Sequence, residues 1–273
     1  MSEAPVVSEP RRRVLGALGE AGLETTRTVS SAYGVFVRTL YYLVRGRHEP
    51  GAIARQMYEI GNRSLVFVSL VMGFVGVILV YQGGIQTQRV LPDLSQLGAT
   101  FLELLVRDLA PSLAALMVAT RVGAGIAAEL GSMAVTEQLD ALRLSAADPV
   151  DYLVKPRFVA SVVMLFVLTI VSGTVAYACG LVGAQVFFEL SPRSFVDLSL
   201  VDAVDLGSGL AKCLAYGAAI PILSAHAGLT AQGGSNAVGA ATTRAVVHSS
   251  LAVIALDFAI SFGAHALFGD FSR

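Results

Sequence analysis

The chain has 273 residues, of which 55% are hydrophobic and only 14% are charged. Soluble domains carry about 25% charged residues, so this deficit, together with a mean hydropathy of +0.69, predicts an integral membrane protein. The formal net charge of −1 gives no general attraction to nucleic acid. The two cysteines provide neither a disulfide framework nor the spacing of a metal site.

Residues 1–50 are predicted to form a polar tail followed by an amphipathic helix. Apolar residues recur at helical spacing from Val14 to Val44, with Arg27, Arg38 and Arg45 between them. Such a helix would lie on the membrane surface, with its arginines near anionic lipid. The alternative is a helix packed on a soluble partner.

Residues 51–273 are expected to cross the membrane five times. The first apolar segment, Ser64 to Gly84, contains no formal charge and would form about 31 Å of helix, enough to span a bilayer. The other spans are expected near 97–120, 158–188, 207–229 and 240–268. The predicted fold class is therefore an all-α integral membrane protein with an interfacial N-terminal helix.

Five spans place the two ends of the chain on opposite sides of the membrane. Most of the arginines and lysines near the ends of the spans fall on the side that holds the N-terminus and residues 121–157. The positive-inside rule therefore predicts that the N-terminus is cytoplasmic and that the C-terminus lies outside.

Four ionisable residues lie well inside the predicted spans: Arg107, Asp108, Lys212 and Asp257. Each would be costly in lipid, so each should face a partner or a wet cavity. We expect Lys212 and Asp257 to form an ion pair between the fourth and fifth spans. The whole set is either a structural ion-pair network or the polar lining of a substrate cavity.

The substrate-binding hypothesis centres on Arg107. Tyr81 and Gln82 close the first span near the face from which Arg107 and Asp108 enter the second, so these four residues can border one outward-opening cavity. A guanidinium can bind two phosphate oxygens at once. Asp108 would then orient Arg107 or balance its charge.

Residues 129–145, between the second and third spans, are predicted to form a helix outside the membrane. Its polar side chains would be the contacts with a soluble motor: Glu129, Glu137, Gln138, Asp140 and Arg143. The alternative is an ordinary solvated helix. Asp148-Pro149 is typical of an N-cap followed by proline at the first helical position, which would start the helix leading to the third span.

Sequence motifs for catalysis are missing from this chain. A phosphate-binding P-loop needs Gly-Lys-Ser/Thr, but the only two lysines follow Val154 and Ala211. There is also no HExxH, no GxSxG and no metal cluster. We therefore expect a non-catalytic subunit without a cofactor or metal of its own.

Three stretches, residues 107–142, 148–160 and 241–258, resemble the MlaE/YrbE-type permeases of lipid-transporting ABC systems. The last reads ATTRAVVHSSLAVIALDF, and the likeness extends from the N-terminal helix to the C-terminus. One departure is the order Arg107-Asp108-Leu109-Ala110-Pro111, where the family commonly has Arg-Glu-Leu-Gly-Pro. Asp108 keeps the negative charge of the family's glutamate on a shorter side chain.

The resemblance implies a permease subunit of the bacterial inner membrane that forms a homodimer. It implies an ABC ATPase docked on residues 129–145, which binds the ATP, and an MCE-domain lipid-binding protein on the outer side. In some systems a STAS-domain protein joins them. The substrate would be phospholipid or a related lipid moved between the inner membrane and the outer envelope, a role tied to outer-membrane lipid asymmetry.

Two other functions compete with this one. The four intramembrane charges could serve an ion-coupled secondary transporter or channel, and the chain could be a membrane scaffold that transports nothing. Co-purification with an ATPase favours the permease, whereas lipid transport that follows an ion gradient and ignores ATP favours the secondary transporter.

Overall fold

The computed structural model describes residues 9–46, 51–90, 94 and 96–268, with only the backbone of residues 9–25, 27 and 90. Every regular element in this part of the chain is a helix. Five segments are long and apolar enough to cross a membrane: Ala52–Arg89, Leu97–Val135, Val150–Phe188, Ala203–Leu229 and Ser235–Leu267. The structure thus confirms the predicted all-α membrane fold with five spans.

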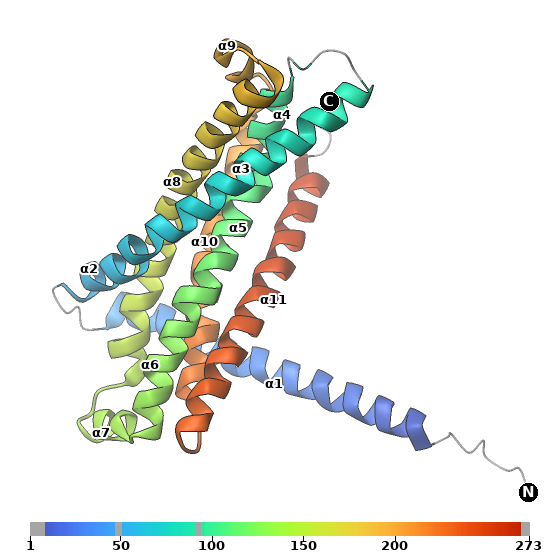
Figure 1. Cartoon of the computed structure of the whole chain (residues 1–273). Helices are drawn as coiled ribbons and strands as arrows, with labels where there is room; N and C mark the ends of the chain where they lie inside the picture. The colour runs from blue at the N-terminus through green and yellow to red at the C-terminus, as the bar shows by residue number, and fades with distance from the viewer. Residues whose placement is uncertain (1–8, 47–50, 91–93, 95, 269–273) are drawn as a thin grey trace, which may run out of the picture.

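The spans form an elongated bundle with two distinct ends (Figure 1). The α7 end holds α7 (Gln138–Leu144) and the turn between α10 (Ala203–Leu229) and α11 (Ser235–Phe268). The opposite, α9 end holds α9 (Pro192–Phe195) and the start of α4 (Leu97–Leu104). α10 lies in the interior and packs against α5 (Ala110–Val118), α6 (Ala124–Val135), α8 (Lys155–Phe188) and α11.

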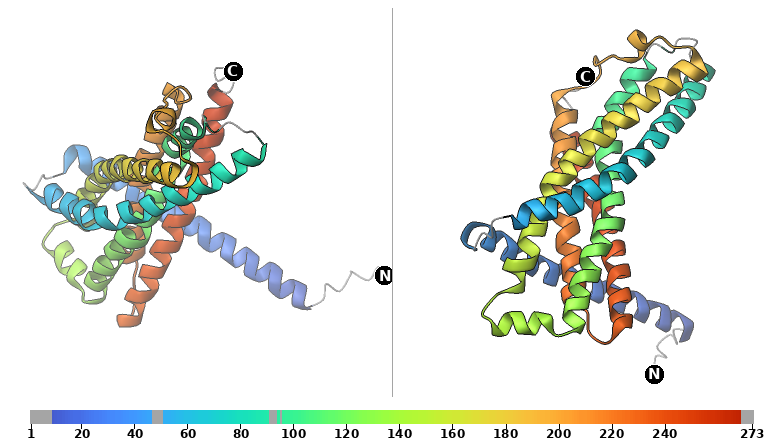
Figure 2. Two further views of the ribbon diagram at one scale, coloured as in Figure 1. Left: turned by 45° about the horizontal axis from the view of Figure 1, so that its top comes forward. Right: turned by 60° about the vertical axis from the view of Figure 1, so that its left-hand side comes forward.

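The N-terminal helix α1 (Glu9–Arg45) runs across the bundle near the α7 end rather than along it (Figures 1 and 2). Its apolar side chains Val29 and Tyr33 are 60% and 66% exposed, so the bundle does not cover them. Tyr42 Oη donates a hydrogen bond of 2.8 Å to Asp148 Oδ2, which ties α1 to the segment before the third span. A helix that lies flat with an uncovered apolar face fits the interfacial position expected for it.

The first span is longer than the sequence predicts. It begins with α2 (Ala52–Met57) and continues through a π-helical turn, η1 (Tyr58–Asn62), into α3 (Arg63–Val90). The predicted end of this span at Gly84 is therefore too early, and Arg89 belongs to the helix. Helical spans can project beyond the hydrocarbon layer or tilt within it, so length in charge-free residues underestimates them.

Three further π-helical turns lie in the second and third spans: η2 (Leu105–Leu109) and η3 (Ala119–Gly123) within the second, and η4 (Val150–Val154) at the start of the third. The turns η2 and η4 are caused by prolines, because Pro111 follows η2 and Pro156 follows η4. A proline ring clashes with the carbonyl four residues earlier, which is that of Arg107 in η2 and of Tyr152 in η4. The wider π turn relieves this clash and re-aims the side chains around it.

Close contacts between spans depend on glycines. A side chain at Gly76 of α3 would clash with the carbonyl of Ala176 in α8, and a Cβ at Gly217 of α10 would lie 2.8 Å from the Cα of Val162. Small residues at such positions let membrane helices approach closely. They let both α3 and α10 pack closely against α8.

The prediction of one helix over 129–145 is wrong in its bounds. Helix α6 extends the second span to Val135, the chain turns at Thr136 and Glu137, and α7 begins only at Gln138. Glu137 adopts a left-handed conformation, with φ 59°. The start of α6 stays helical because Ile126, Ala127 and Leu130 are buried, which places Glu129 on a span and not on α7.

The N-terminal cap of the third span agrees with the prediction. Asp148 Oδ1 accepts a hydrogen bond of 2.9 Å from the backbone amide of Val150, with Pro149 between them in the first helical position. The connection between the predicted third and fourth spans is not all loop. It contains α9, and Asp205 already belongs to α10, where it forms a capping box with Asp202.

Candidate functional site

A network of charged side chains lies between the second, fourth and fifth spans. At its centre is Lys212 of α10, which is fully buried. Its ammonium lies 2.8 Å from Asp257 Oδ1 of α11 and is also paired with Asp108 Oδ1 of η2. One lysine therefore joins three spans through two carboxylates.

Neutral donors complete the coordination of Asp257. Ser112 Oγ and Tyr216 Oη donate hydrogen bonds of 2.9 and 2.7 Å to Asp257 Oδ1, the oxygen that also faces Lys212. Tyr216 is fully buried. A carboxylate inside a membrane protein needs such partners, because each unmet hydrogen bond is costly in a medium of low dielectric constant.

Arg107 lies at the edge of this network, toward the α9 end. Its guanidinium is 3.8 Å from Asp108 Oδ2 and 3.6 Å from Asp205 Oδ1, and its side chain is 37% exposed. These are ion pairs beyond hydrogen-bonding distance, so the donors of Arg107 remain available. Arg107 also lines a pocket of about 290 Å³ whose other polar residues are Glu103, Ser199, Asp202, Asp205, Ser208 and His265.

Tyr81 and Gln82 do not line the pocket that contains Arg107. The ring of Tyr81 instead packs on α8, with its centroid 5.0 Å from that of Phe187 and 6.3 Å from that of Phe188. The structure thus brings Arg107 and Asp108 together with Lys212 and Asp257, but leaves Tyr81 and Gln82 apart from them within one chain.

The residues predicted to contact a soluble motor are divided between α6 and α7. On α7, Asp140 and Arg143 form an exposed ion pair of 2.9 Å, and Gln138 is the first helical residue. Glu137 precedes it in the left-handed turn. On α6, Glu129 Oε1 lies 2.6 Å from a guanidinium nitrogen of Arg157 at the start of α8.

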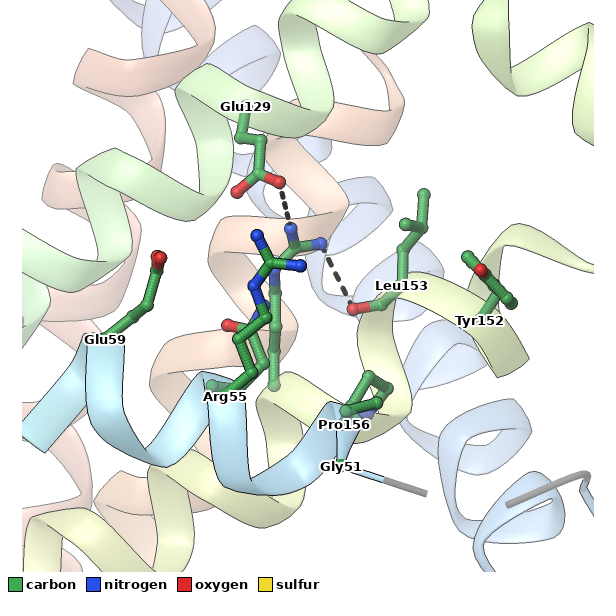
Figure 3. Close-up of a pocket in the computed structure, with 10 residues that line it drawn as sticks. Gly51, Arg55, Glu59, Glu129, Tyr152, Leu153 and Pro156 are labelled. Atoms are coloured by element: carbon green, nitrogen blue, oxygen red, sulfur yellow. Dashed lines mark hydrogen bonds and ion pairs between the residues drawn. The ribbon is translucent and has the colours of Figure 1, made fainter. Parts of the chain in front are cut away.

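The Glu129–Arg157 pair closes one wall of a polar pocket of about 570 Å³ on the side of the bundle nearest α2. Arg157 is only 3% exposed, and it also donates a hydrogen bond of 3.1 Å to the backbone carbonyl of Leu153. Figure 3 shows Arg55 and Glu129 pointing into this pocket from opposite walls. The pair links α6 to α8, the two spans that α7 connects.

Sequence reasoning missed four residues of these sites. Ser112 and Tyr216 carry no charge, so nothing in the sequence marks them as partners of Asp257. Asp205 lies outside the predicted fourth span, although the spacing Asp202-x-x-Asp205 is that of a capping box and could have placed it at a helix start. Arg157 entered the sequence analysis only as one of the positive charges that predict the membrane orientation, and not as a partner of Glu129.

Comparison with known proteins places these features in a family. Residues 53–262 match the family model described as Permease MlaE. A probable ABC transporter permease protein of Synechocystis is 35% identical over 242 residues, which cover 85% of this chain and 89% of that protein. One of Rickettsia conorii is 36% identical over 211 residues, or 77% and 81% of the two chains.

A plant protein also matches. The chloroplastic protein of Arabidopsis thaliana named trigalactosyldiacylglycerol 1 is 34% identical over 209 residues, which cover 76% of this chain and 59% of the plant protein.

Proposed function

This chain belongs to the MlaE permease family, and we propose on that basis that it carries phospholipid through the membrane as the permease of an ABC transporter. The pocket at the α9 end would hold the head group, with Arg107 on its phosphate. Arg107 carries the proposal because it is the partly exposed cation of the network, and its two carboxylate contacts, at 3.6 and 3.8 Å, leave its hydrogen-bond donors available. Guanidinium–phosphate bonds are among the strong charge-assisted ones.

Two further observations support a lipid substrate. One relative is named after trigalactosyldiacylglycerol, which is a lipid. In this chain, long apolar side chains on α3 and α11 are uncovered, including Phe74 (64%), Ile78 (55%), Phe258 (73%) and Phe262 (64%). These faces can contact acyl chains. They can also contact a second copy of the chain in a homodimer, whose two-fold axis would relate two copies of Arg107.

The energy source would be a separate ABC ATPase that docks at the α7 end and binds the ATP. This assignment rests on the absence of a Gly-Lys-Ser/Thr motif from the sequence and on the exposed Asp140 and Arg143 of α7. The Glu129–Arg157 pair would pass the motion of α7 to both spans that it joins. We place the α7 end and the N-terminus in the cytoplasm of a bacterium and the C-terminus in the periplasm.

An MCE-domain lipid carrier at the α9 end, and in some systems a STAS-domain protein, would complete the assembly. Both follow from the family resemblance.

Replacing Arg107 tests the substrate role. Arg107→Ala and Arg107→Lys should assemble with the ATPase but lose most of the bound phospholipid, because alanine removes the charge and lysine cannot bind two oxygens at once. The measurement is mass spectrometry of lipid in the purified complex. Arg193→Ala, an exposed arginine on α9, is the control. If Arg107→Ala carries as much lipid as the parent, or does not assemble, Arg107 does not bind the substrate.

The charge network also keeps a second candidate open, an ion-coupled transporter. Lys212 is shared between Asp108 and Asp257, an arrangement in which an ion or proton could replace one of the contacts. Such a protein would move its substrate along an imposed ion gradient in the absence of ATP.

A further inference from the structure

A second set of cationic side chains lines a continuous cleft near the α7 end, away from the Arg107 pocket. A cavity of about 200 Å³ shares Gln56, Glu59, Glu129 and Arg157 with the polar pocket of Figure 3. It shares Arg63 and Arg121 with an open groove of about 570 Å³ that also contains Val66, Phe67 and Thr120. We call this connected space the α2–α6 cleft.

The charge of the α2–α6 cleft is positive. Four arginines (55, 63, 121 and 157) and two glutamates (59 and 129) line it, which gives a formal net charge of +2. Arg157 is neutralised by Glu129. Arg63 and Arg121 are exposed and form no ion pair within the part of the chain that the structure describes.

A buried hydroxyl and an open space mark the same cavity. Ser64 is 1% exposed, lines the cavity, and its Oγ has no hydrogen-bond partner among the described residues. A buried hydroxyl without a partner is costly and uncommon in folded proteins. On the facing helix, a Cβ at Gly125 would meet no atom within 4 Å. The cavity therefore has room for a ligand group that accepts hydrogen bonds.

Irregular backbone surrounds this space. The turns η1 and η3 contribute Glu59 and Arg121 to its walls, and η4 contributes Tyr152 and Leu153 to the adjoining pocket. π-helical turns within α-helices are frequent at functional sites, because they change the direction of nearby side chains. Three of the four in the described chain border the α2–α6 cleft, and the fourth holds Arg107.

The groove is apolar where it leaves the arginines. Val66 and Phe67 are 71% and 48% exposed, and the uncovered face continues along α3 with Leu70 and Phe74. An inorganic anion would gain nothing from this face, whereas the acyl chains of a lipid would lie against it. Basic pockets between spans on the cytoplasmic side of membrane proteins are typical sites for anionic lipid head groups.

We propose that the α2–α6 cleft binds an anionic phospholipid of the cytoplasmic leaflet, with its phosphate between Arg63 and Arg121 and its acyl chains along Val66 and Phe67. The site is separate from the Arg107 pocket. The proposal rests on the cytoplasmic placement of the α7 end proposed above, but not on the role of Arg107.

Lipid retention tests the proposal. The full-length protein, purified from membranes, is placed in nanodiscs with equal amounts of phosphatidylglycerol and phosphatidylcholine, and the lipid it retains is measured by native mass spectrometry. The parent should retain phosphatidylglycerol preferentially. Arg63→Gln with Arg121→Gln should lower that retention about 25-fold, since each arginine near an anionic lipid contributes a factor of about five.

Two variants sharpen the test. Gly125→Leu should fill the cavity and reduce retention without changing any charge, while Arg193→Gln removes an exposed arginine at the α9 end and should have no effect. Retention of phosphatidylglycerol by the Arg63→Gln, Arg121→Gln protein at the parent level overturns the proposal, as does equal retention of the two lipids by the parent. Displacement by an excess of inorganic phosphate would also overturn it, since it would identify the occupant as the free ion.

The Arg107→Ala variant separates this site from the substrate pocket. If the cleft binds lipid independently, Arg107→Ala keeps the preference for phosphatidylglycerol whether or not it still carries cargo. If instead Arg107→Ala abolishes that preference and the Arg63→Gln, Arg121→Gln variant keeps it, the anionic lipid lies at Arg107. In that case the cleft proposal fails and the proposed function stands.

Discussion

The fully buried ammonium of Lys212 offers the sharpest test of the charge network. Lys212→Met keeps the length and apolar stem of the side chain but leaves Asp108 and Asp257 without their shared cation. Stranding one buried charge typically costs about 3–5 kcal/mol. Asp257 would retain its hydrogen bonds from Ser112 and Tyr216, and Asp108 would retain Arg107 at 3.8 Å. We therefore expect a loss of about 3 kcal/mol, near the lower end of that range.

The pairing scheme makes a graded prediction. Adding Asp257→Asn to Lys212→Met should recover only part of the lost stability, because Asp108 still lacks Lys212 and keeps only the longer contact with Arg107. Adding Asp108→Asn as well should recover most of it, since the charges that then remain, those of Arg107 and Asp205, compensate each other. Unfolding in detergent micelles, followed by circular dichroism, and the yield of monodisperse protein measure both effects.

The exposed arginine of α9 provides a control for this series. Arg193→Met also replaces a cation by methionine, but at a solvent-exposed position, so its effect should stay within about 0.5 kcal/mol. The reasoning is refuted if Lys212→Met is as stable as the parent. It is also refuted if the losses of Lys212→Met, Asp257→Asn and Asp108→Asn simply add.

Two other predictions concern the role of α7 and the orientation of the chain in the membrane. Glu137→Lys with Asp140→Lys should leave the fold intact, because the exposed Asp140–Arg143 pair contributes at most about 1 kcal/mol. The double variant should nevertheless release or uncouple the ATPase. Normal assembly and transport would show that α7 is not the docking site of the ATPase. In a cysteine-free background, Ser199→Cys should react with a membrane-impermeant thiol reagent in spheroplasts whereas Ser145→Cys should not, and the reverse pattern would invert the orientation.

The number of spans could be predicted from the sequence because it depends on apolar length, a local property that needs no knowledge of packing. The cap at Asp148 was also predictable, since an N-cap followed by proline acts within a few residues. The break between α6 and α7 was not, because neither glycine nor proline marks Thr136 or Glu137. There the chain turns where burial of α6 ends.

The site was predictable only in its charges. A charge inside a span must find a partner, and this rule identified Arg107, Asp108, Lys212 and Asp257. It could not show that Lys212 contacts two acids at once, since that depends on how α10 and α11 face η2. The α2–α6 cleft was beyond sequence reasoning because its four arginines come from three separate spans, and each one alone is an ordinary residue of a membrane boundary.

The central claim is that a separate ATPase drives lipid movement through this chain, and transport in proteoliposomes tests it most directly. The complex is reconstituted with fluorescent phospholipid, and transfer to an acceptor is followed with ATP, with a non-hydrolysable analogue, or with an imposed proton or sodium gradient alone. We predict transfer that requires hydrolysable ATP and is unchanged when either gradient is dissipated. Transfer that follows an ion gradient without ATP would contradict the permease and identify an ion-coupled transporter.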